Sequence, residues 1–386
     1  MITSKKLLEI AKQIIPYGRA EMQQIGYEGE LPEELADKLG TFRFEQPTVA
    51  VLENVDLAGP TGVCFYDNDV VLDVAYYGRW DVLERNRVYY DYALQCKGEE
   101  PVKLEGAWCN LAGVWSGNYY HWILESLTKL EGVLEYERQT GEKVSILTHT
   151  APAKYVTDSL EAAGFNSFKR WILHEPHYQV EKLIIPSQRR RQGRTAKGAI
   201  EYLHSLAGDL GNHLEDFQYY ISRKDASVRR IVNEAEILEA LSSYEIIPVQ
   251  PEQLSLPSQI ASFRTASTII GMHGSGLVNM VWAKNPRVIE IMTPDYINPC
   301  FFTICAAMGW RYDWIMGRPV EGQSEDVWVD VEELKRVLFK QEVDFLMDST
   351  DKSPEAMQFP SLEDYQKILL GITEADRKKL LYGEWD

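Results

Sequence analysis

The sequence predicts an α/β protein of two domains, and three observations lead to this prediction. The chain has 386 residues, which is more than one small core can use. Hydrophobic residues make up 45% and charged residues 25%, as in folded globular proteins. In the second half, short apolar runs alternate with amphipathic stretches. This alternation indicates parallel strands joined by helical crossovers, because parallel neighbours need a long connection.

The first half is less regular. Residues 1 to about 40 favour helix, and three runs that follow favour strands: Thr48–Leu52, Val70–Ala75 and Val88–Ala93. After Asn118 we expect a helix, because four apolar residues form one stripe: Ile123, Leu127, Leu130 and Leu134. Further strands are expected at 144–147, 171–173 and 183–185, with a helix near 154–163 between the first two.

The second half gives the clearer pattern. We expect five strands, at Gln218–Ser222, Glu245–Val249, Thr268–Gly271, Val288–Met292 and Tyr312–Ile315. A helix is expected to begin at Asn233, with Glu236 at capping-box spacing, and others are expected near 331–341 and in the tail from residue 361. Ligands of parallel sheets bind beyond the carboxyl ends of the strands. The residues that follow these strands are therefore the first candidates for a site.

Composition limits the partners and the compartment. Lys and Arg number 40 against 58 Asp and Glu, a net charge of −18, so we expect no nucleic acid partner. The five cysteines form no CxxC pair, which argues against a zinc site and against a disulfide framework. No stretch is apolar enough for a signal peptide or a membrane span. We expect a cytoplasmic protein, with peripheral attachment to a membrane left open.

A glycine-rich turn runs from Gly271 to Gly276, between an expected strand and an expected helix. Glycines allow a ligand to approach the backbone closely, and a helix N-terminus offers free N–H groups to an anion such as a diphosphate. His273 in this turn could donate a hydrogen bond to a phosphate or to a sugar. The spacing is not GxGxxG, which argues against a nicotinamide or flavin site. A tight connection without a ligand is the alternative.

Charged residues follow two strands of the same sheet. Arg223 and Lys224 come directly after one strand and are followed by Arg229 and Arg230, which suits a diphosphate because arginine binds phosphate oxygens with fixed charge. Glu290 lies near the end of another strand, where a carboxylate can accept hydrogen bonds from ribose hydroxyls. The alternatives are a solvated basic loop, and an ion pair of Glu290 with Arg287 or another surface cation.

His121 and Glu125 are spaced to share one face of the expected helix, opposite its apolar stripe. A histidine held by a carboxylate can act as the general base that removes a proton from a hydroxyl. The alternative is a polar helix face without chemistry. The basic run Arg189–Arg191 is interpreted as a flexible, solvated loop, although it could also receive an anionic acceptor.

Four blocks of the sequence resemble the glycosyltransferase 61 family, which includes capsular polysaccharide biosynthesis proteins. They are NYYHWILESLTKL (118–130), YISRKDASVRRIVNEAEIL (220–238), QIASFRTASTIIGMHGSGLVNMVW (259–282) and VIEIM (288–292). The resemblance implies a GT-B type fold, in which two Rossmann-like domains face a cleft and a C-terminal helix returns to the first domain. The expected limits are an acceptor-side domain at 1–210, a nucleotide-sugar domain at 211–355 and a helical tail at 356–386.

The resemblance also implies residue roles. Arg223 and Arg230 would contact the diphosphate of a nucleotide sugar, commonly a UDP-sugar. The cradle would consist of four residues: His273, Gly274, Ser275 and Gly276. Glu290 would hold the ribose, and His121 with Glu125 would serve the acceptor.

The function implied is an inverting glycosyl transfer to a saccharide or lipid-linked acceptor, as in surface polysaccharide synthesis. We expect no metal ion and no bound cofactor, because no DxD pair follows a strand of the second half. Two other functions stay open: a nucleotide-sugar epimerase, and a binding or scaffold protein without catalysis.

Overall fold

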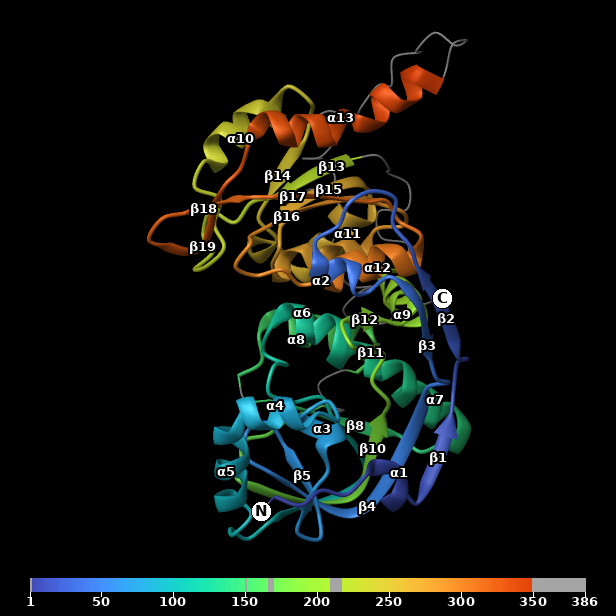
Figure 1. Ribbon diagram of the computed structural model, residues 1–386. Coiled ribbons are helices and arrows are strands. Elements are labelled where there is room, and N and C mark those ends of the chain that lie inside the picture. Colours follow the sequence, from blue (N-terminus) through green and yellow to red (C-terminus); the bar gives the residue numbers. More distant parts are fainter. Residues whose placement is uncertain (1, 150, 166–169, 209–216, 349–386) are drawn as a thin grey trace. The chain divides into compact units, whose positions relative to one another are not determined.

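The computed structural model describes residues 2–149, 151–165, 170–208 and 217–348 (Figure 1). The chain folds into two compact units. The first unit runs as far as Gln23 and continues from Arg43 to Tyr202, and the second contains Gln24–Phe42 and continues from Leu203. The helical tail predicted at 356–386 lies outside the described residues.

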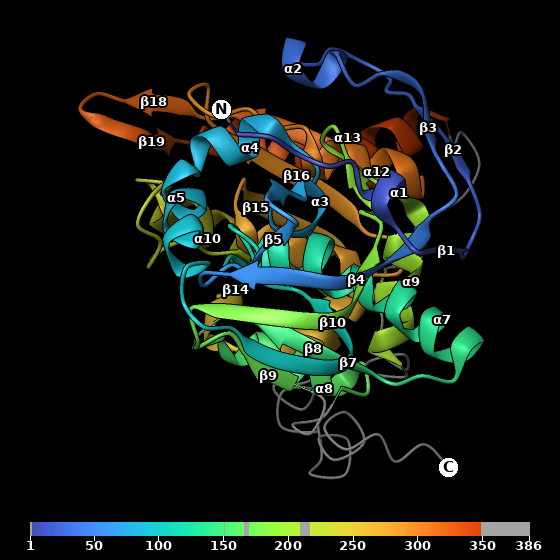
Figure 2. The ribbon, with the colours of Figure 1, turned by 90° about the horizontal axis from the view of Figure 1, so that it is seen from below.

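The first unit is built on a mixed sheet with the strand order β6-β5-β4-β10-β7-β8-β9, and β1 pairs with β4. Four strands at its centre lie side by side in Figure 2: β4 (Thr48–Ala58), β10 (His177–Pro186), β7 (Val102–Asn110) and β8 (Val144–Thr148). The ladders from β10 through β7 and β8 to β9 (Arg170–Ile172) are parallel. Those of β4 with β1 (Gln13–Pro16), β10 and β5 (Val63–Tyr66) are antiparallel, as is that of β5 with β6 (Asp69–Val70).

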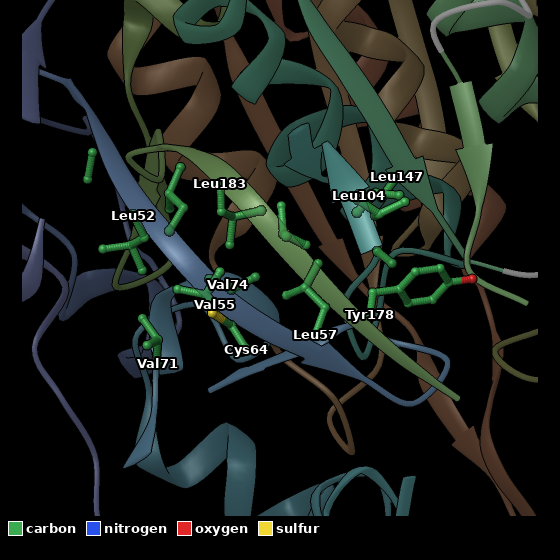
Figure 3. Close-up of a cluster of buried hydrophobic side chains, with 14 of the residues drawn as sticks. Leu52, Val55, Leu57, Cys64, Val71, Val74, Leu104, Leu147, Tyr178 and Leu183 are labelled. Carbon is green, nitrogen blue, oxygen red and sulfur yellow. The ribbon is translucent and has the colours of Figure 1, made fainter. Parts of the chain in front are cut away.

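Apolar side chains on one face of this sheet form a buried core (Figure 3). Leu52 and Leu57 from β4 pack there with Tyr178 and Leu183 from β10, and none of these four is more than 1% exposed. Leu104 from β7 and Leu147 from β8 extend the same cluster. The core thus joins the antiparallel and the parallel parts of the sheet.

Three expectations for residues 1–96 are wrong. Residues 1–40 contain two short helices, α1 (Leu7–Ile10) and α2 (Glu33–Ala36), and their other regular elements are strands, among them β2 (Glu21–Ile25) and the start of β3 (Gly40–Phe44). The expected strand at 70–75 is mostly helix α3 (Leu72–Ala75), and the one at 88–93 lies in helix α5 (Arg87–Cys96), which follows α4 (Trp80–Arg85). The buried residues of α5 are Tyr90, Ala93 and Cys96, a spacing of three that places them on one helix face.

The other helices of this part of the chain connect its strands. A helical run follows β7 and contains α6 (Tyr119–His121) and α7 (Leu130–Thr140), and α8 (Lys154–Ala162) follows β8. The hairpin of β11 (Arg190–Arg191) and β12 (Arg194–Thr195) precedes α9 (Lys197–Ala207).

The second unit contains the parallel sheet that the sequence predicted. Its order is β14-β13-β15-β16-β17, and every ladder is parallel. The strands are β13 (Phe217–Ile221), β14 (Ile247–Val249), β15 (Ala266–Met272), β16 (Arg287–Met292) and β17 (Tyr312–Met316). Figure 1 shows helices on both faces of this sheet, and its inner strands β13, β15 and β16 are accordingly buried on both sides and form largely apolar runs.

On one face lie α10 (Glu234–Ser242) and α13 (Val331–Asp348), and on the other lie α11 (Leu256–Arg264) and α12 (Cys300–Met308) (Figure 1). Two 3₁₀ segments, Pro251–Gln253 and Ser275–Trp282, and the hairpin of β18 (Arg318–Val320) with β19 (Gln323–Trp328) complete the unit. The expected capping box at Asn233 is wrong, because its side chain makes no cap and instead bonds the backbone of Val329.

Candidate functional site

The strand order of the second unit indicates where a ligand binds. β13 lies between β14 and β15, so the chain crosses from one side of β13 to the other after β14. In open parallel sheets, ligands bind at such a switch point, beyond the carboxyl ends of the two strands. β13 ends at Ile221 and leads to Arg223, and β15 ends at Met272 and leads to His273 and Gly274. The predicted arginine and the predicted glycine turn therefore start from the same edge of the sheet.

Arg223 and Gly274 are in direct contact. A Cβ added at Gly274 would lie 2.8 Å from Arg223 Cζ and closer still to Nη1. Two hydrogen bonds hold the guanidinium there: Nη2 donates to the carbonyl of Val228 (2.7 Å) and Nε to that of Arg229 (2.9 Å). Gly274 has a φ of 170°, which any residue adopts, so the glycine is required by space rather than by backbone conformation.

The charge of Arg223 lacks a carboxylate partner at hydrogen-bond distance among the described residues. Its guanidinium hydrogen bonds go to neutral carbonyls. Burial lowers the pKa of Arg223, and the nearby charge of Arg229 lowers that pKa further, although more distant carboxylates act against both effects. Arg229 itself pairs with Glu325 (2.7 Å). The half-buried charge of Arg223 therefore is the one that favours an anionic ligand, since such a ligand would supply its missing negative charge.

Arg229, which belongs to the expected basic cluster but has no named role in the resemblance, also reaches the glycine turn. Its Nε donates to the carbonyl of His273 (3.2 Å), and its guanidinium lies 4.8 Å from the ring centroid of Tyr296. Its backbone has a φ of +56°, in the left-handed region that is rare for arginine. Strained backbone of this kind is concentrated at functional sites.

The structure does not bring the guanidinium of Arg230 to the turn. Nε and Nη2 both donate to one oxygen of Asp326, at 2.9 and 2.7 Å, and the backbone N–H bonds the other oxygen. Two adjacent arginines thus point to different partners, which sequence spacing alone does not distinguish. A diphosphate contact by Arg230 would require this pair to open.

His273 and Glu290 form a buried pair. Nδ1 of His273 contacts one carboxylate oxygen of Glu290, and the other oxygen accepts a hydrogen bond from Tyr312 Oη (2.6 Å). Glu290 is 0% exposed, so neither oxygen is available to a ribose in this structure. The alternative ion pair with Arg287 is absent, because Arg287 pairs with Asp313. A ribose contact by Glu290 stays a prediction. In this structure the carboxylate of Glu290 contacts His273 and Tyr312 instead.

The predicted cradle residues Ser275 and Gly276 begin the helical segment that follows. This segment, Ser275–Trp282, is a 3₁₀ helix, and the N–H of Leu277 already bonds the carbonyl of Gly274. The helical segment expected after the turn is therefore present, although it is of a tighter type than expected.

His121 and Glu125 lie at an irregular turn in the first unit. The helix expected after Asn118 changes at Trp122–Ser126 into a π-helical turn, then into a 3₁₀ turn at Leu127–Lys129. Within it, His121 Nδ1 and Glu125 Oε2 are 2.8 Å apart. Asn118 caps the run by accepting from the N–H of Tyr120. π-helical turns occur frequently at functional sites.

Glu125 is more enclosed than the sequence indicated. The face opposite the apolar stripe is buried as well, with Glu125 4% and Thr128 0% exposed, whereas the side chain of His121 keeps 24% exposure. Burial by itself raises the pKa of Glu125, but its hydrogen bond to His121 and the charges of His121 and Arg190 outweigh burial and lower it. Glu125 is therefore a carboxylate at neutral pH and holds the ring of His121.

The interpretation of Arg189–Arg191 as a solvated loop is wrong for Arg189 and Arg190, whereas Arg191 is exposed as expected. Arg189 is 5% exposed and pairs with Glu131 and Glu21. Arg190 donates from Nη1 to Glu125 Oε1 (2.8 Å) and lies over the ring of Tyr120. Each guanidinium needs a carboxylate because it is largely removed from water. A cluster of arginines in an acidic chain is unusual and could have indicated buried ion pairs. The sequence alone does not show which carboxylates pair with these arginines.

The part of the chain that the structure describes contains neither a metal-binding cluster nor a membrane-spanning helix. Within it, no three His, Cys, Asp or Glu side chains are grouped so that they could hold a metal ion. None of the helices described has both the length and the apolar character of a membrane span. All five cysteines are buried free thiols.

Comparisons with known proteins agree with the resemblance. Residues 119–289 match the family described as Glycosyltransferase 61. Over 97 residues the chain is 32% identical to the EGF domain-specific O-linked N-acetylglucosamine transferase of Drosophila melanogaster. The matched stretch covers 24% of this chain and 18% of that protein. Over 89 residues the chain is 28% identical to protein O-linked-mannose beta-1,4-N-acetylglucosaminyltransferase 2 of Takifugu rubripes. That match covers 22% of this chain and 15% of the Takifugu protein. The chain thus spans less than a fifth of the length of these curated relatives.

Proposed function

We propose, for a chain whose residues 119–289 match the glycosyltransferase 61 family, that it transfers a sugar from a nucleotide donor to an acceptor hydroxyl. The observation that carries the proposal is the contact of Arg223 with Gly274 at the switch point of the parallel sheet. A guanidinium without a carboxylate contact, beside an amide-rich turn, suits the diphosphate of a nucleotide.

The donor is a UDP-sugar in this proposal. Arg223 and the N–H groups after Gly274 bind the diphosphate and stabilise the negative charge that develops on it as the glycosidic bond breaks. His273 adds a polar side chain at the same turn. Both relatives carry N-acetylglucosamine transfer in their names, so UDP-N-acetylglucosamine is the first donor to test.

The chemical step is a direct displacement with inversion at the anomeric carbon. The acceptor oxygen forms a bond to that carbon while the bond from the carbon to the diphosphate oxygen breaks. Glu125 accepts a hydrogen bond from Nδ1 of His121, which leaves the lone pair of Nε2 to take the proton of the acceptor hydroxyl. The uridine diphosphate leaves with the electron pair of the broken bond.

Several finer predictions belong to the same proposal. They are the GT-B arrangement, with an acceptor-side domain at 1–210 and a nucleotide-sugar domain at 211–355, and a saccharide or lipid-linked acceptor. They also include a role in capsular or other surface polysaccharide synthesis, a cytoplasmic location with peripheral membrane contact, and transfer without a metal ion. EDTA should accordingly leave the rate of transfer unchanged.

The test is a thermal-shift screen of nucleoside diphosphates, followed by product analysis with UDP-sugars. A ligand that binds only the native state raises the melting temperature. Stabilisation by UDP, together with transfer to an acceptor, supports the proposal. Conversion of the donor without acceptor indicates an epimerase, and UDP binding without any turnover indicates a binding or scaffold protein. The absence of stabilisation by every nucleotide contradicts the proposed site.

A further inference from the structure

The His273–Glu290 pair has a third member, Tyr312, which no sequence motif indicated. Tyr312 is the first residue of β17 and is 6% exposed, and its hydroxyl donates to the second oxygen of Glu290 at 2.6 Å. Burial raises the pKa of Tyr312 well above its ordinary value, and the charge of Glu290 raises it further. The hydroxyl therefore stays protonated and remains a donor to Glu290.

This arrangement restricts the imidazole of His273. A carboxylate that accepts one hydrogen bond at each oxygen cannot rotate without losing one of them, and in a fully buried site no water replaces the lost bond. The ring of His273 also lies 5.3 Å from that of Tyr296 and 5.1 Å from that of Phe301. Among the described residues no hydrogen bond to Nε2 is present, so this nitrogen is left for a ligand.

An early segment of the chain packs against Tyr312. Gln24–Phe42 folds with the second unit, although residues on both sides of it in sequence belong to the first. The ring of Tyr27 lies edge-on to Tyr312, with centroids 6.4 Å apart, and to Phe302, with centroids 5.8 Å apart. Trp314 Nε1 donates to the carbonyl of Glu30 (3.2 Å), 284 positions away in sequence.

We propose that Tyr312 and Tyr27 are positioning residues for the donor site. Tyr312 holds the carboxylate of Glu290, which holds the ring of His273 with Nε2 toward the diphosphate, and Tyr27 holds the ring of Tyr312. The identity of the ligand rests on the proposed function, whereas the order of the three contacts rests on geometry alone. Neither tyrosine touches the ligand in this scheme, so each acts through His273.

A double-mutant cycle on UDP affinity tests the scheme. Tyr312→Phe removes one hydroxyl and keeps the ring, and it should weaken UDP binding about five- to tenfold, because it loosens His273 without removing a contact to the ligand itself. In the background of His273→Ala, the same substitution should have no further effect. Losses that add in the double variant would mean that Tyr312 acts by another route, and would overturn the proposal.

Tyr27 provides the second arm of the experiment. Tyr27→Ala should weaken UDP binding and Tyr27→Phe should restore it, because the ring is the part that packs on Tyr312. Tyr89→Phe, which removes a hydroxyl from an exposed tyrosine of α5, is the control and should bind UDP as wild type does. Equal affinities of Tyr27→Ala and wild type would exclude Tyr27 from the scheme.

A measurement without ligand separates this inference from the proposed function. The imidazole ¹⁵N and ¹H signals of His273 should move or broaden in Tyr312→Phe and in Tyr27→Ala, and should be unchanged in Tyr89→Phe. If they do so in a protein that does not bind UDP, the positioning stands and the proposed ligand falls. If they stay unchanged in all three variants, the positioning is refuted whatever the protein binds.

Discussion

The substitution Gly274→Ala tests the proposed diphosphate site most directly. The added Cβ would lie 2.8 Å from Arg223 Cζ and closer to Nη1, well inside van der Waals contact. The extended backbone of Gly274 accepts an alanine without strain, so the collision is the only local effect. Two hydrogen bonds to backbone carbonyls hold the guanidinium in place, and we therefore expect the methyl group to displace it from both.

The size of the effect follows from the hydrogen bonds that are lost. A hydrogen bond that involves a charged group contributes about 1.5–3 kcal/mol. If the displaced guanidinium loses one such bond to the diphosphate, UDP binds about 10- to 100-fold more weakly. The two lost carbonyl bonds are partly replaced, because a displaced guanidinium can turn toward water, so we expect the free energy of unfolding to fall by roughly 2 kcal/mol, a shift of a few degrees in melting temperature. The variant should therefore fold and bind UDP poorly.

The assay is calorimetric titration of UDP into the wild type, Gly274→Ala, Arg223→Met and the double variant. Gly26→Ala is the control, because a Cβ at that position meets nothing within 4 Å. If the alanine acts by moving Arg223, the double variant binds no more weakly than Arg223→Met. A folded Gly274→Ala protein with wild-type affinity for UDP would refute the site, since the collision is unavoidable if the guanidinium is where the structure has it.

Three further predictions follow from the contacts of single residues. His121→Ala should slow transfer by about 10²- to 10⁴-fold with its fold and UDP affinity intact, and a near wild-type rate in steady-state assays would show that His121 is not the base. Arg230→Met should weaken UDP binding far less than Arg223→Met in the same titrations, because its guanidinium is committed to Asp326, and equal losses would contradict this. Glu125→Gln leaves Arg190 without its carboxylate and should lower the free energy of unfolding by about 3 kcal/mol at neutral pH. The folded-state pKa of Glu125 is lowered, so the ionised carboxylate stabilises the fold fully above the unfolded-state pKa of about 4.3, and this stabilisation is lost as the pH falls below that value. Denaturant curves of the wild type and Glu125→Gln should therefore converge in acid.

The parallel sheet of the second unit could be predicted because its inner strands β13, β15 and β16 are buried on both faces. Such strands appear as apolar runs with helices between them, and all five expected strands are present. The helix at Arg87–Cys96 could not be separated from a strand in the same way. Its run of aromatic and β-branched residues fits both, and packing of Tyr90, Ala93 and Cys96 against the core decides for the helix.

The sequence by itself determined which residue types follow which strands, and so it determined that Arg223 and the turn of Gly274 meet at one sheet edge. Local order is enough for that, because the carboxyl ends of parallel strands share an edge. Only the tertiary structure decided which partner each charged group takes. Arg230 bonds Asp326, Arg190 bonds Glu125, and Tyr312 bonds Glu290 across distances in sequence that no local pattern spans. Each buried charge must find its partner wherever packing brings one, and packing is a property of the whole fold.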